Sequence, residues 1–402
     1  MKKIPPSAAM LFIAVIIQNI SSGTAYSGYG IAMHDLIDEF GISRSTGALG
    51  SSILAVVSAF AAPLSGKLID RWSLRKTVLV GAVIGALGLT LASFAPNFIV
   101  LLIGFSLMGG LGNTFCGSLP SSSIASRWFP QRTGMAVAVC MLPIMVTVGT
   151  PAFGWIITQV GWRGLFGLFA GLYVFALLPA AFIRDFPPGG LERRAANAAL
   201  MPEFKATTLL RQSTFWCLVI GIGILFSAAI TLVSHVVSAA VEVGVDKPTA
   251  AFLVSMVGVS AAFGGLGFGW LGDRIGAGYA LVTNALLTGI GWLFLSVSTS
   301  FATMAPCVIL IGICTGSAVV SPLSAYIAHT YGRDVFGRVF GLLKQFTLPL
   351  LFAGPVVIGA LYDFTHSYRV PFLFVAALCG LSAALLFVVQ RRSAALPVAV
   401  AI

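Results

Sequence analysis

The sequence predicts an all-α membrane protein with twelve transmembrane helices, arranged as two pseudo-symmetric halves of six. Three observations carry this prediction: the composition, a succession of long apolar segments and an internal repeat. Of the 402 residues, 58% are hydrophobic and 9% are charged, whereas a soluble protein carries about 25% charged residues. The mean hydropathy is +1.00, so the apolar residues exceed what soluble domains could bury. The composition excludes a disordered chain, a secreted disulfide scaffold and an ordinary cytosolic enzyme.

Twelve segments are apolar and long enough to cross a bilayer, which takes about 20 residues because the hydrocarbon layer is roughly 30 Å thick. Lipid offers no hydrogen bonds to the backbone, so each crossing is expected to be a helix. The longest gap separates six segments from six. It divides the chain into an N-terminal half at 1–183, a cytoplasmic linker at 184–211 and a C-terminal half at 212–402 with a short tail. The segments are 8–33, 46–66, 77–95, 98–126, 133–160, 164–183, 213–241, 248–272, 279–298, 301–328, 339–362 and 370–390.

The distribution of basic residues predicts the orientation. With both termini in the cytoplasm, the inner loops hold 18 of the 23 Lys and Arg residues and the outer loops hold four. Basic residues favour the cytoplasmic side, so we expect a multi-pass protein of the plasma (inner) membrane with both termini cytoplasmic. The net charge of +11 indicates loops beside anionic headgroups rather than nucleic acid. The six cysteines lie in apolar stretches without metal-ligand spacing, so neither a metal nor a cofactor is expected.

An internal repeat appears when the sequence is shifted by 203 residues against itself. The aligned features lie at equivalent ends of helices in the two halves. They are Glu39 with Glu242, Gly134 with Gly337, and Gly66-x-x-x-Asp70-Arg71 with Gly269-x-x-x-Asp273-Arg274. Two six-helix halves related by an axis along the membrane normal, with a site between them, are a transporter architecture.

At the repeated loops the chain resembles the major facilitator superfamily, whose signature after helix two is roughly G-x-x-x-D-R-x-G-R-K-K. The first loop reads GKLIDRWSLRK and the second GWLGDRIGAG, so the usual glycine and first basic residue are replaced in the first copy. In the family this loop's Asp and Arg hold the cytoplasmic side shut. The resemblance implies a gating role for Asp70, Arg71, Asp273 and Arg274. The alternative is that these charges only anchor helix ends in water.

Two further stretches resemble the monocarboxylate and oxalate–formate branch of that superfamily. They are YGIAMHDLIDEFGISRS at 29–45, and ASRWFPQRTGMAVAV at 125–139 followed by GWRGLF at 161–166. The resemblance implies a small organic anion as substrate, moved by proton symport or anion exchange. The expected partners are this anion, protons and the lipid bilayer, without nucleic acid and with the monomer as the functional form.

Lys344 is the only charged residue inside the twelve segments. A charge at membrane depth is costly unless it is partnered or faces water, so it indicates function, and a lone cation favours an anion. In oxalate-transporting relatives a lysine on helix eleven binds the substrate carboxylate, and Lys344 stands at the matching place. The alternative is that its ammonium group snorkels to the headgroups. The family's helix-eight arginine would fall at Gly265 and an acidic partner at Ala261, so a single carboxylate held by one cation is expected.

The remaining candidates are neutral polar residues at mid-depth in the predicted helices. We expect substrate contacts from Asn19, Tyr26, Asn113, Thr231, Ser317, Ser321 and Gln345, and proton coupling from His235 or Lys344. The alternative for small polar residues is helix packing through short hydrogen bonds. The alternative for His235, toward the outer third of its helix, is an imidazole that faces the headgroups.

The leading functional prediction is a secondary transporter that carries a small organic anion, most simply a monocarboxylate, by alternating access. An exporter of neutral or lipophilic compounds is the second hypothesis, and the lack of Asp and Glu inside the segments argues against it. A membrane enzyme or a non-transporting sensor is the third. The chain has no HExxH motif and no paired carboxylates at bilayer depth, which general acid–base or metal catalysis would use, so no enzymatic activity is expected.

Overall fold

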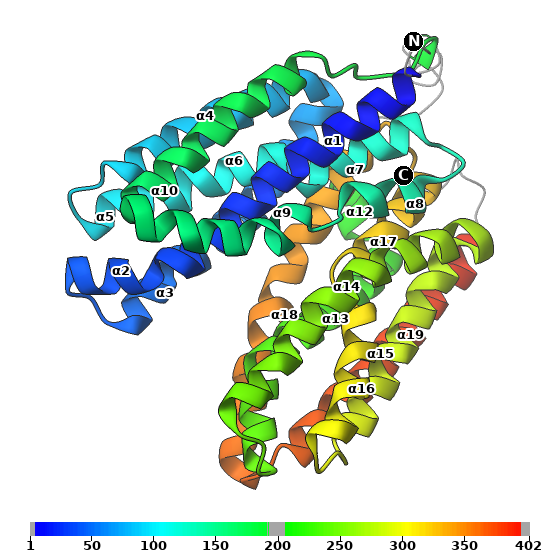
Figure 1. The fold of residues 1–402 in the computed structure, drawn as a ribbon. Helices are drawn as coiled ribbons and strands as arrows, with labels where there is room; N and C mark the ends of the chain where they lie inside the picture. The colour runs from blue at the N-terminus through cyan, green and yellow to red at the C-terminus, as the bar shows by residue number, and fades with distance from the viewer. Residues whose placement is uncertain (1–4, 191, 193–205, 395–402) are drawn as a thin grey trace. The chain divides into compact units, whose positions relative to one another are not determined.

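The computed structural model describes residues 5–190, 192 and 206–394, and helices make up almost all of this part of the chain (Figure 1). Eleven of the described helical stretches are long and apolar enough to cross a membrane. Residues 191 and 193–205 of the expected linker lie outside the described residues. The prediction of an all-helical membrane protein is confirmed.

The first half of the chain contains long helices that are divided at several points by short irregular turns. Its elements are α1 Pro6–Ser22, η1 Gly23–Ser27, α2 Gly28–Phe40, α3 Arg44–Arg71, α4 Leu74–Ser93, α5 Phe98–Leu101, η2 Leu102–Met108, α6 Gly109–Cys116, α7 Ser118–Trp128, α8 Thr133–Cys140, α9 Ile144–Thr147 and α10 Gly149–Ala181. The two elements named η1 and η2 are π-helical.

The second half contains fewer and longer helices. Its elements are α12 Ala206–Leu210, α13 Ser213–Glu242, α14 Lys247–Ile275, α15 Ala277–Leu295, α16 Phe301–Ile313, α17 Ser317–Thr330, α18 Phe336–Thr365 and α19 Arg369–Ala394. The core of this half contains Trp292, which is fully buried and packs edge-on against Phe372 at 5.0 Å.

The fifth expected crossing, 133–160, is not one continuous helix. It is broken at residues 141–143 between α8 and α9, because Pro143 has no backbone N–H to donate and disfavours a helical residue before it. The chain then turns inside α10 at Gly161, whose φ of 67° and ψ of 178° are not helical. Within the described residues, eleven helical stretches are therefore long and apolar enough to cross a membrane, and the first part of the fifth expected crossing is a shorter apolar helical stretch at Thr133–Thr147.

The chain folds into two compact units, each of which includes one short segment from the opposite half of the sequence. Unit 1 comprises Met1–Pro130, Cys140–Ala199 and Arg333–Gln345, and unit 2 comprises Gln131–Val139, Leu200–Gly332 and Phe346–Ile402. The start of α18 therefore belongs to unit 1, and most of α8 belongs to unit 2.

Glycine allows close helix contacts inside unit 1. A Cβ atom at Gly85 would lie 2.5 Å from the ring of Tyr173, and one at Gly66 would lie 2.0 Å from the carbonyl oxygen of Gly337. Helices in lipid associate through such close approaches of small residues. The contact at Gly66 fixes the first turn of α18 on α3.

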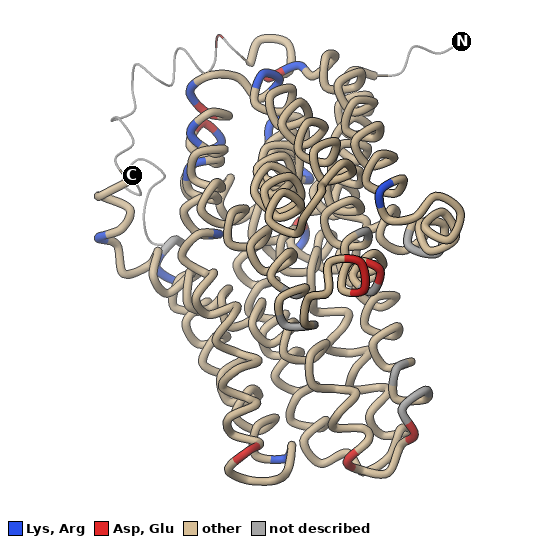
Figure 2. Tube along the Cα trace, turned by 90° about the vertical axis from the view of Figure 1, so that its left-hand side faces the viewer, with Lys and Arg blue, Asp and Glu red and all other residues tan. Residues whose placement is uncertain are grey.

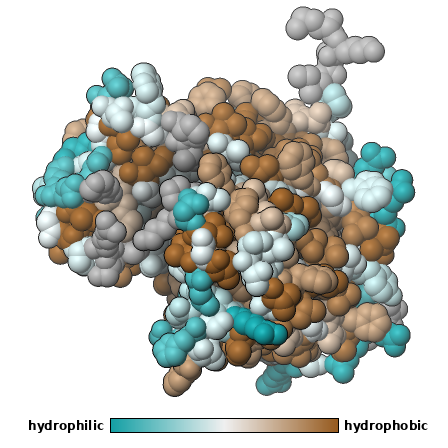
Figure 3. Space-filling model, turned by 60° about the horizontal axis from the view of Figure 1, so that its bottom comes forward, coloured by the Kyte–Doolittle hydropathy of each residue, from teal (hydrophilic) through white to brown (hydrophobic). Residues whose placement is uncertain are grey.

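The surface of the described residues suits a lipid environment. Large apolar side chains are exposed along the helices, among them Phe12, Trp155, Phe263 and Val356. Figure 3 shows hydrophobic side chains over much of one face, and Figure 2 shows long stretches of helix without a charged residue.

The last turn of α2 is fastened to α10 by an ion pair. The Glu39 carboxylate accepts hydrogen bonds from the Arg163 guanidinium and from the indole N–H of Trp162. Partial burial raises the pKa of Glu39, but these two hydrogen bonds and the positive charge of Arg163 outweigh it and leave that pKa below its usual value.

Candidate functional site

The first part of the site lies where two irregular helix segments of unit 1 meet. The π-helix η1 interrupts the first crossing, and such π-bulges are frequent at functional sites. A Cβ atom at Gly23 of η1 would lie 2.5 Å from Cγ of Met145, in α9 beyond the break at 141–143. Asn19 joins the two segments, because its Oδ1 accepts the backbone N–H of Met145 at 2.9 Å. Asn19 thereby satisfies an N–H that the helix break leaves without a partner.

Asn113 is the centre of a buried polar cluster in unit 1. Its Oδ1 accepts a hydrogen bond of 2.7 Å from the Ser21 hydroxyl, and its Nδ2 donates to the Ser58 hydroxyl at 3.4 Å. The Tyr26 hydroxyl also interacts with the Asn113 side chain. Tyr26 is 62% exposed as a residue, so part of its side chain lies outside this buried cluster.

Lys344 joins the same region from the start of α18. Its Nζ donates a hydrogen bond of 3.2 Å to the hydroxyl of Ser118, the first residue of α7. Gly117 separates α6 from α7 in a non-helical conformation, and a Cβ atom there would lie 2.4 Å from the carbonyl oxygen of Asn113 and 3.1 Å from the Ser21 hydroxyl. The ammonium group of Lys344 and the Asn113 cluster therefore meet at one break between two helices. Gln345, the next residue of α18, is partly buried.

Three of the predicted neutral residues lie in unit 2 and are packed between helices. Thr231 is buried and lies against Gly354 of α18, where a Cβ atom would meet its hydroxyl at 2.8 Å. The Ser317 hydroxyl lies 2.0 Å from the Cβ position of Gly265, so it occupies the space that a side chain at position 265 would need. The Ser321 hydroxyl is fully buried and makes no hydrogen bond with the described residues.

His235 belongs to α13 and contacts two other segments of unit 2. Its Nε2 is 3.0 Å from the carbonyl oxygen of Pro355 in α18, and its Nδ1 is 3.4 Å from the hydroxyl of Tyr368, just before α19. The imidazole is therefore engaged by protein groups on both ring nitrogens.

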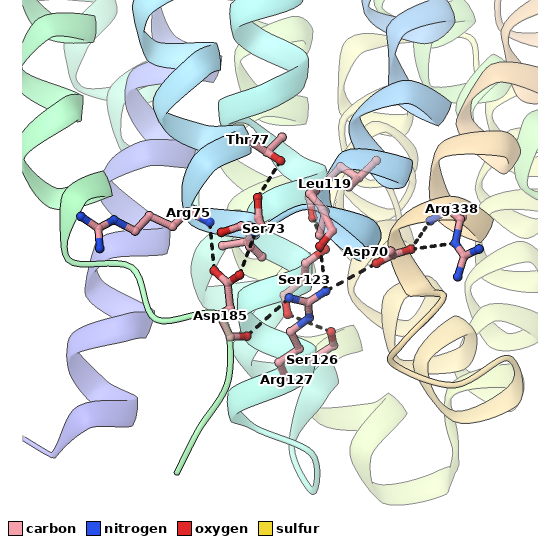
Figure 4. A network of polar contacts seen from close by, with 12 residues as sticks. Asp70, Ser73, Arg75, Thr77, Leu119, Ser123, Ser126, Arg127, Asp185 and Arg338 are labelled. Atoms are coloured by element: carbon pink, nitrogen blue, oxygen red, sulfur yellow. Dashed lines mark hydrogen bonds and ion pairs between the residues drawn. The ribbon is translucent and has the colours of Figure 1, made fainter. Parts of the chain in front are cut away.

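Asp70, the aspartate of the first motif copy, forms a second site at the start of α18 (Figure 4). Asp70 is 1% exposed. One of its oxygens lies 3.4 Å from the Arg127 guanidinium, and the other accepts the backbone N–H of Arg338 at 2.9 Å and lies 3.5 Å from its Nε. A carboxylate at a helix N-terminus is stabilised by the unpaired N–H groups and by the helix dipole. Asp70 therefore fixes the beginning of α18 in unit 1.

Arg127 extends this network to the end of α10. Its guanidinium donates to the carbonyl oxygens of Ile69 and Asp185, each at 3.4 Å, and stacks over the Phe186 ring at 4.6 Å. The carboxylate of Asp185 accepts the backbone N–H groups of Leu74 and Arg75 at 3.2 and 3.0 Å, at the start of α4 (Figure 4).

The second copy of the motif makes the equivalent contact in unit 2. The Asp273 carboxylate accepts the backbone N–H groups of Gly134 and Met135, both at 2.9 Å, at the start of α8. Met135 and Arg338 correspond under the 203-residue shift, so each repeated Asp binds the same position of the short segment that its unit takes from the other half.

The other two residues of the repeated motif lie at exposed positions. Arg71 is exposed at the end of α3, and Arg274 is exposed and lies over the Trp270 ring at 4.7 Å. Sequence reasoning did not single out Arg127, Asp185, Arg338 or Ser118. Two features of the sequence could have pointed to two of these residues. Arg127 lies inside the RWF stretch, and Ser118 aligns with Ser321 under the 203-residue shift.

Comparison with known proteins identifies the family. The family model described as Major Facilitator Superfamily matches residues 15–347 and 231–400. The chain belongs to the major facilitator superfamily. The fold class is confirmed as the helical facilitator fold, with the fifth expected crossing broken as described. Members of this family are transporters and not enzymes, so this facilitator performs secondary transport of small solutes.

Individual relatives show which members of the family the chain resembles. The facilitator is 24% identical over 402 residues to monocarboxylate transporter 2 of Mus musculus, covering 93% of this chain and 82% of that one. It is 28% identical over 386 residues to monocarboxylate transporter 6 of Homo sapiens, covering 89% and 74%. The predicted resemblance to the monocarboxylate branch is confirmed by these matches.

Solved structures share the fold. The human organic anion transporter MFSD10 aligns with a TM-score of 0.70 and 17% identity, covering 95% of this chain and all of that one. The transporter FucP, crystallised in its outward conformation, aligns with a TM-score of 0.73 and 15% identity, covering 97% and 99%. At these identities the likeness concerns the fold alone.

Proposed function

We propose that this facilitator moves a small monocarboxylate across the membrane, with Lys344 as the counter-ion of the carboxylate. The observation that carries the proposal is the position of the Lys344 ammonium group, 3.2 Å from Ser118 at the break between α6 and α7. The monocarboxylate transporters among its relatives support the same substrate class.

The neutral groups around Lys344 suit a carboxylate. A lysine ammonium group has three hydrogens to donate, and a serine hydroxyl can accept from it while donating its own hydrogen elsewhere. The hydroxyls of Ser118 and Tyr26 and the amide of Asn113 can therefore complete the hydrogen bonds of a bound carboxylate. Asn19 contributes by holding the start of α9.

A single carboxylate fits better than two, because unit 2 offers no second cation at the position where the resemblance implies one. Position 265 is glycine, and Ser317 fills the space beside it. A dicarboxylate would leave its second charge without a counter-ion, which is costly away from water. Gln345, Thr231 and Ser321 are proposed as further polar groups along the path.

The conformational cycle would use the two repeated carboxylates as a gate. Asp70 binds the start of α18, which also carries Lys344, and Asp273 binds the start of α8. We propose that releasing these helix starts opens the cytoplasmic side, with Arg71 and Arg274 assisting at the exposed helix ends. We also propose cytoplasmic termini, plasma-membrane residence, a monomeric unit, and energy from proton symport or anion exchange.

The test is uptake of short monocarboxylates into vesicles that contain the purified protein. Lys344→Gln keeps a hydrogen-bond donor but removes the charge. Truncating one partner of a buried charge pair costs about 2–5 kcal/mol, which is roughly 30- to 4,000-fold in affinity. Lys344→Arg should recover only part of the activity, because a planar guanidinium cannot replace a point charge on a flexible stem.

Matched neutral amides of the same acids serve as substrate controls, since they keep the shape and lose the charge. Wild-type uptake of the acids by Lys344→Gln, with normal expression, would contradict the proposal. Uptake of the amides at rates equal to the acids would favour an exporter of neutral compounds instead.

A further inference from the structure

The surroundings of His235 determine which ring nitrogen can take up a proton. A carbonyl oxygen only accepts hydrogen bonds, so Nε2, at 3.0 Å from the Pro355 oxygen, must carry a hydrogen in both protonation states. In the neutral ring Nδ1 then has the lone pair, and it faces the Tyr368 hydroxyl at 3.4 Å. The neutral ring is therefore held as the Nε2–H tautomer, and Nδ1 is its only basic position.

Tyr368, whose hydroxyl faces His235, also lines a cavity of about 350 Å³ in unit 2. The residues that line this cavity come from the end of α13, the loop between α15 and α16, and the start of α19. Its polar lining includes Glu242, Ser298, Thr299, Ser367, Tyr368 and Arg369. The Tyr368 ring is partly buried and stacks on Tyr362 with 4.4 Å between ring centroids. Tyr368 therefore contacts the imidazole and also forms part of the cavity wall.

The charged groups near this hydroxyl are mostly acidic. Glu242 on α13 and Asp363 on α18 both act electrostatically on Tyr368, as does the Tyr362 hydroxyl, while Arg369 lines the cavity. The parts of α14 and α16 packed on this stretch of α13 contribute apolar core residues and Cys307. Two carboxylates and one guanidinium therefore lie around the tyrosine that contacts the imidazole.

We propose that His235 is a proton-binding site that opens to the outer side of the membrane through Tyr368 and acts on α18 at Pro355. When the ring takes up a proton, the Tyr368 hydroxyl proton passes to Nδ1, and a hydronium ion in the cavity returns one proton to the tyrosine oxygen and leaves a neutral water molecule. Tyr368 ends neutral, and His235 gains one positive charge. No other group changes its charge.

The consequence for α18 follows from hydrogen-bond strength. An imidazolium N–H donates a stronger hydrogen bond than a neutral one, so protonation tightens the link between α13 and Pro355. Pro355 is eleven residues beyond Lys344 in the same helix. External acidity would therefore bias the helix that carries the substrate counter-ion. This part of the inference rests on the proposed function.

The first experiment measures proton uptake without transport. Purified protein labelled at histidine Cε1 is titrated by NMR from about pH 5 to 8, the range in which imidazoles titrate. The four histidines are His34, His235, His329 and His366, and the His235 signal is the one lost in His235→Gln. We expect this signal to change with pH in this range, and its response to differ in Tyr368→Phe, which removes the hydroxyl that faces Nδ1. No step for His235 in this range would overturn the proposal.

The second experiment measures uptake of the best monocarboxylate at varied external pH and fixed internal pH. The wild-type rate should change several-fold, and His235→Gln, which can still donate to Pro355 but cannot titrate there, should lose this dependence. His366→Gln is the matched control, because His366 is exposed in the neighbouring loop, and it should respond as wild type. An unchanged pH dependence in His235→Gln would overturn the coupling. If no variant transports any acid, the proposed function fails, while the NMR titration still decides the proton site.

Discussion

At the scale of single residues, the contact between Lys344 and Ser118 is the one that places the cation. The Lys344 ammonium group donates a hydrogen bond of 3.2 Å to the Ser118 hydroxyl. Ser118 can occupy this place because Gly117 interrupts the helix directly before it. The residue that positions the cation is thus set by a local helix break.

The residue-scale prediction concerns Ser118→Ala. Hydrogen bonds to charged groups contribute about 1.5–3 kcal/mol, so removing this hydroxyl should raise the KM for monocarboxylates by roughly 10- to 100-fold with a smaller effect on kcat. Ser118→Thr should restore most of the affinity. Ser122→Ala is the matched control on the same helix, because the Ser122 hydroxyl is buried and makes no hydrogen bond with the described residues. Equal KM values for Ser118→Ala and Ser122→Ala would remove Ser118 from the site.

At the scale of helices, the starts of α8 and α18 are held by carboxylates from other helices. Both carboxylates accept the backbone N–H at the equivalent position of the repeat, Arg338 or Met135, but the groups around the two carboxylates differ. Asp70 faces the buried guanidinium of Arg127 as well as the N–H of Arg338, and Asp273 faces the N–H groups of Gly134 and Met135. The contact at α18 is therefore expected to depend more strongly on charge.

The helix-scale prediction compares Asp70→Asn with Asp273→Asn. Asp70→Asn leaves Arg127 buried with less compensation, and breaking a buried ion pair costs about 3–5 kcal/mol. We expect a lower melting temperature for Asp70→Asn than for Asp273→Asn. We also expect Asp70→Asn to lower the transport rate more than the affinity, because Asp70 would bias the conformational equilibrium without touching the substrate. Thermal unfolding and uptake kinetics measure both effects, and unchanged transport at normal expression would reduce Asp70 to a structural anchor.

At the scale of the whole molecule, the two units are linked by the segments that they exchange. The helix α18 carries Lys344 in its unit 1 part and Pro355 in its unit 2 part. The same helix therefore connects the proposed anion site, the Asp70 contact and the proposed proton site, which gives it a central place in the transport cycle.

The whole-molecule prediction concerns topology. In a background without the six native cysteines, Asn97→Cys between α4 and α5 should react with a membrane-impermeant reagent from outside the cell. Gln131→Cys between α7 and α8 should react only after permeabilisation, because the basic residues predict that this loop is cytoplasmic. Both positions are exposed. The opposite labelling pattern would invert the proposed orientation.

The sequence by itself determined the membrane fold, the family, the repeated Asp motif and Lys344 as the only charge within the crossings, because composition, hydrophobic length and repetition are properties of the chain alone. It did not predict the break at 141–143 or the tautomer of His235, although Pro143 was a visible local signal for the break. Tertiary structure alone decided that Ser118 meets Lys344, that Arg127 meets Asp70 and that Tyr368 stands before His235. Each of these contacts joins residues 57 to 226 positions apart, and such partners are chosen by packing, which no local pattern encodes.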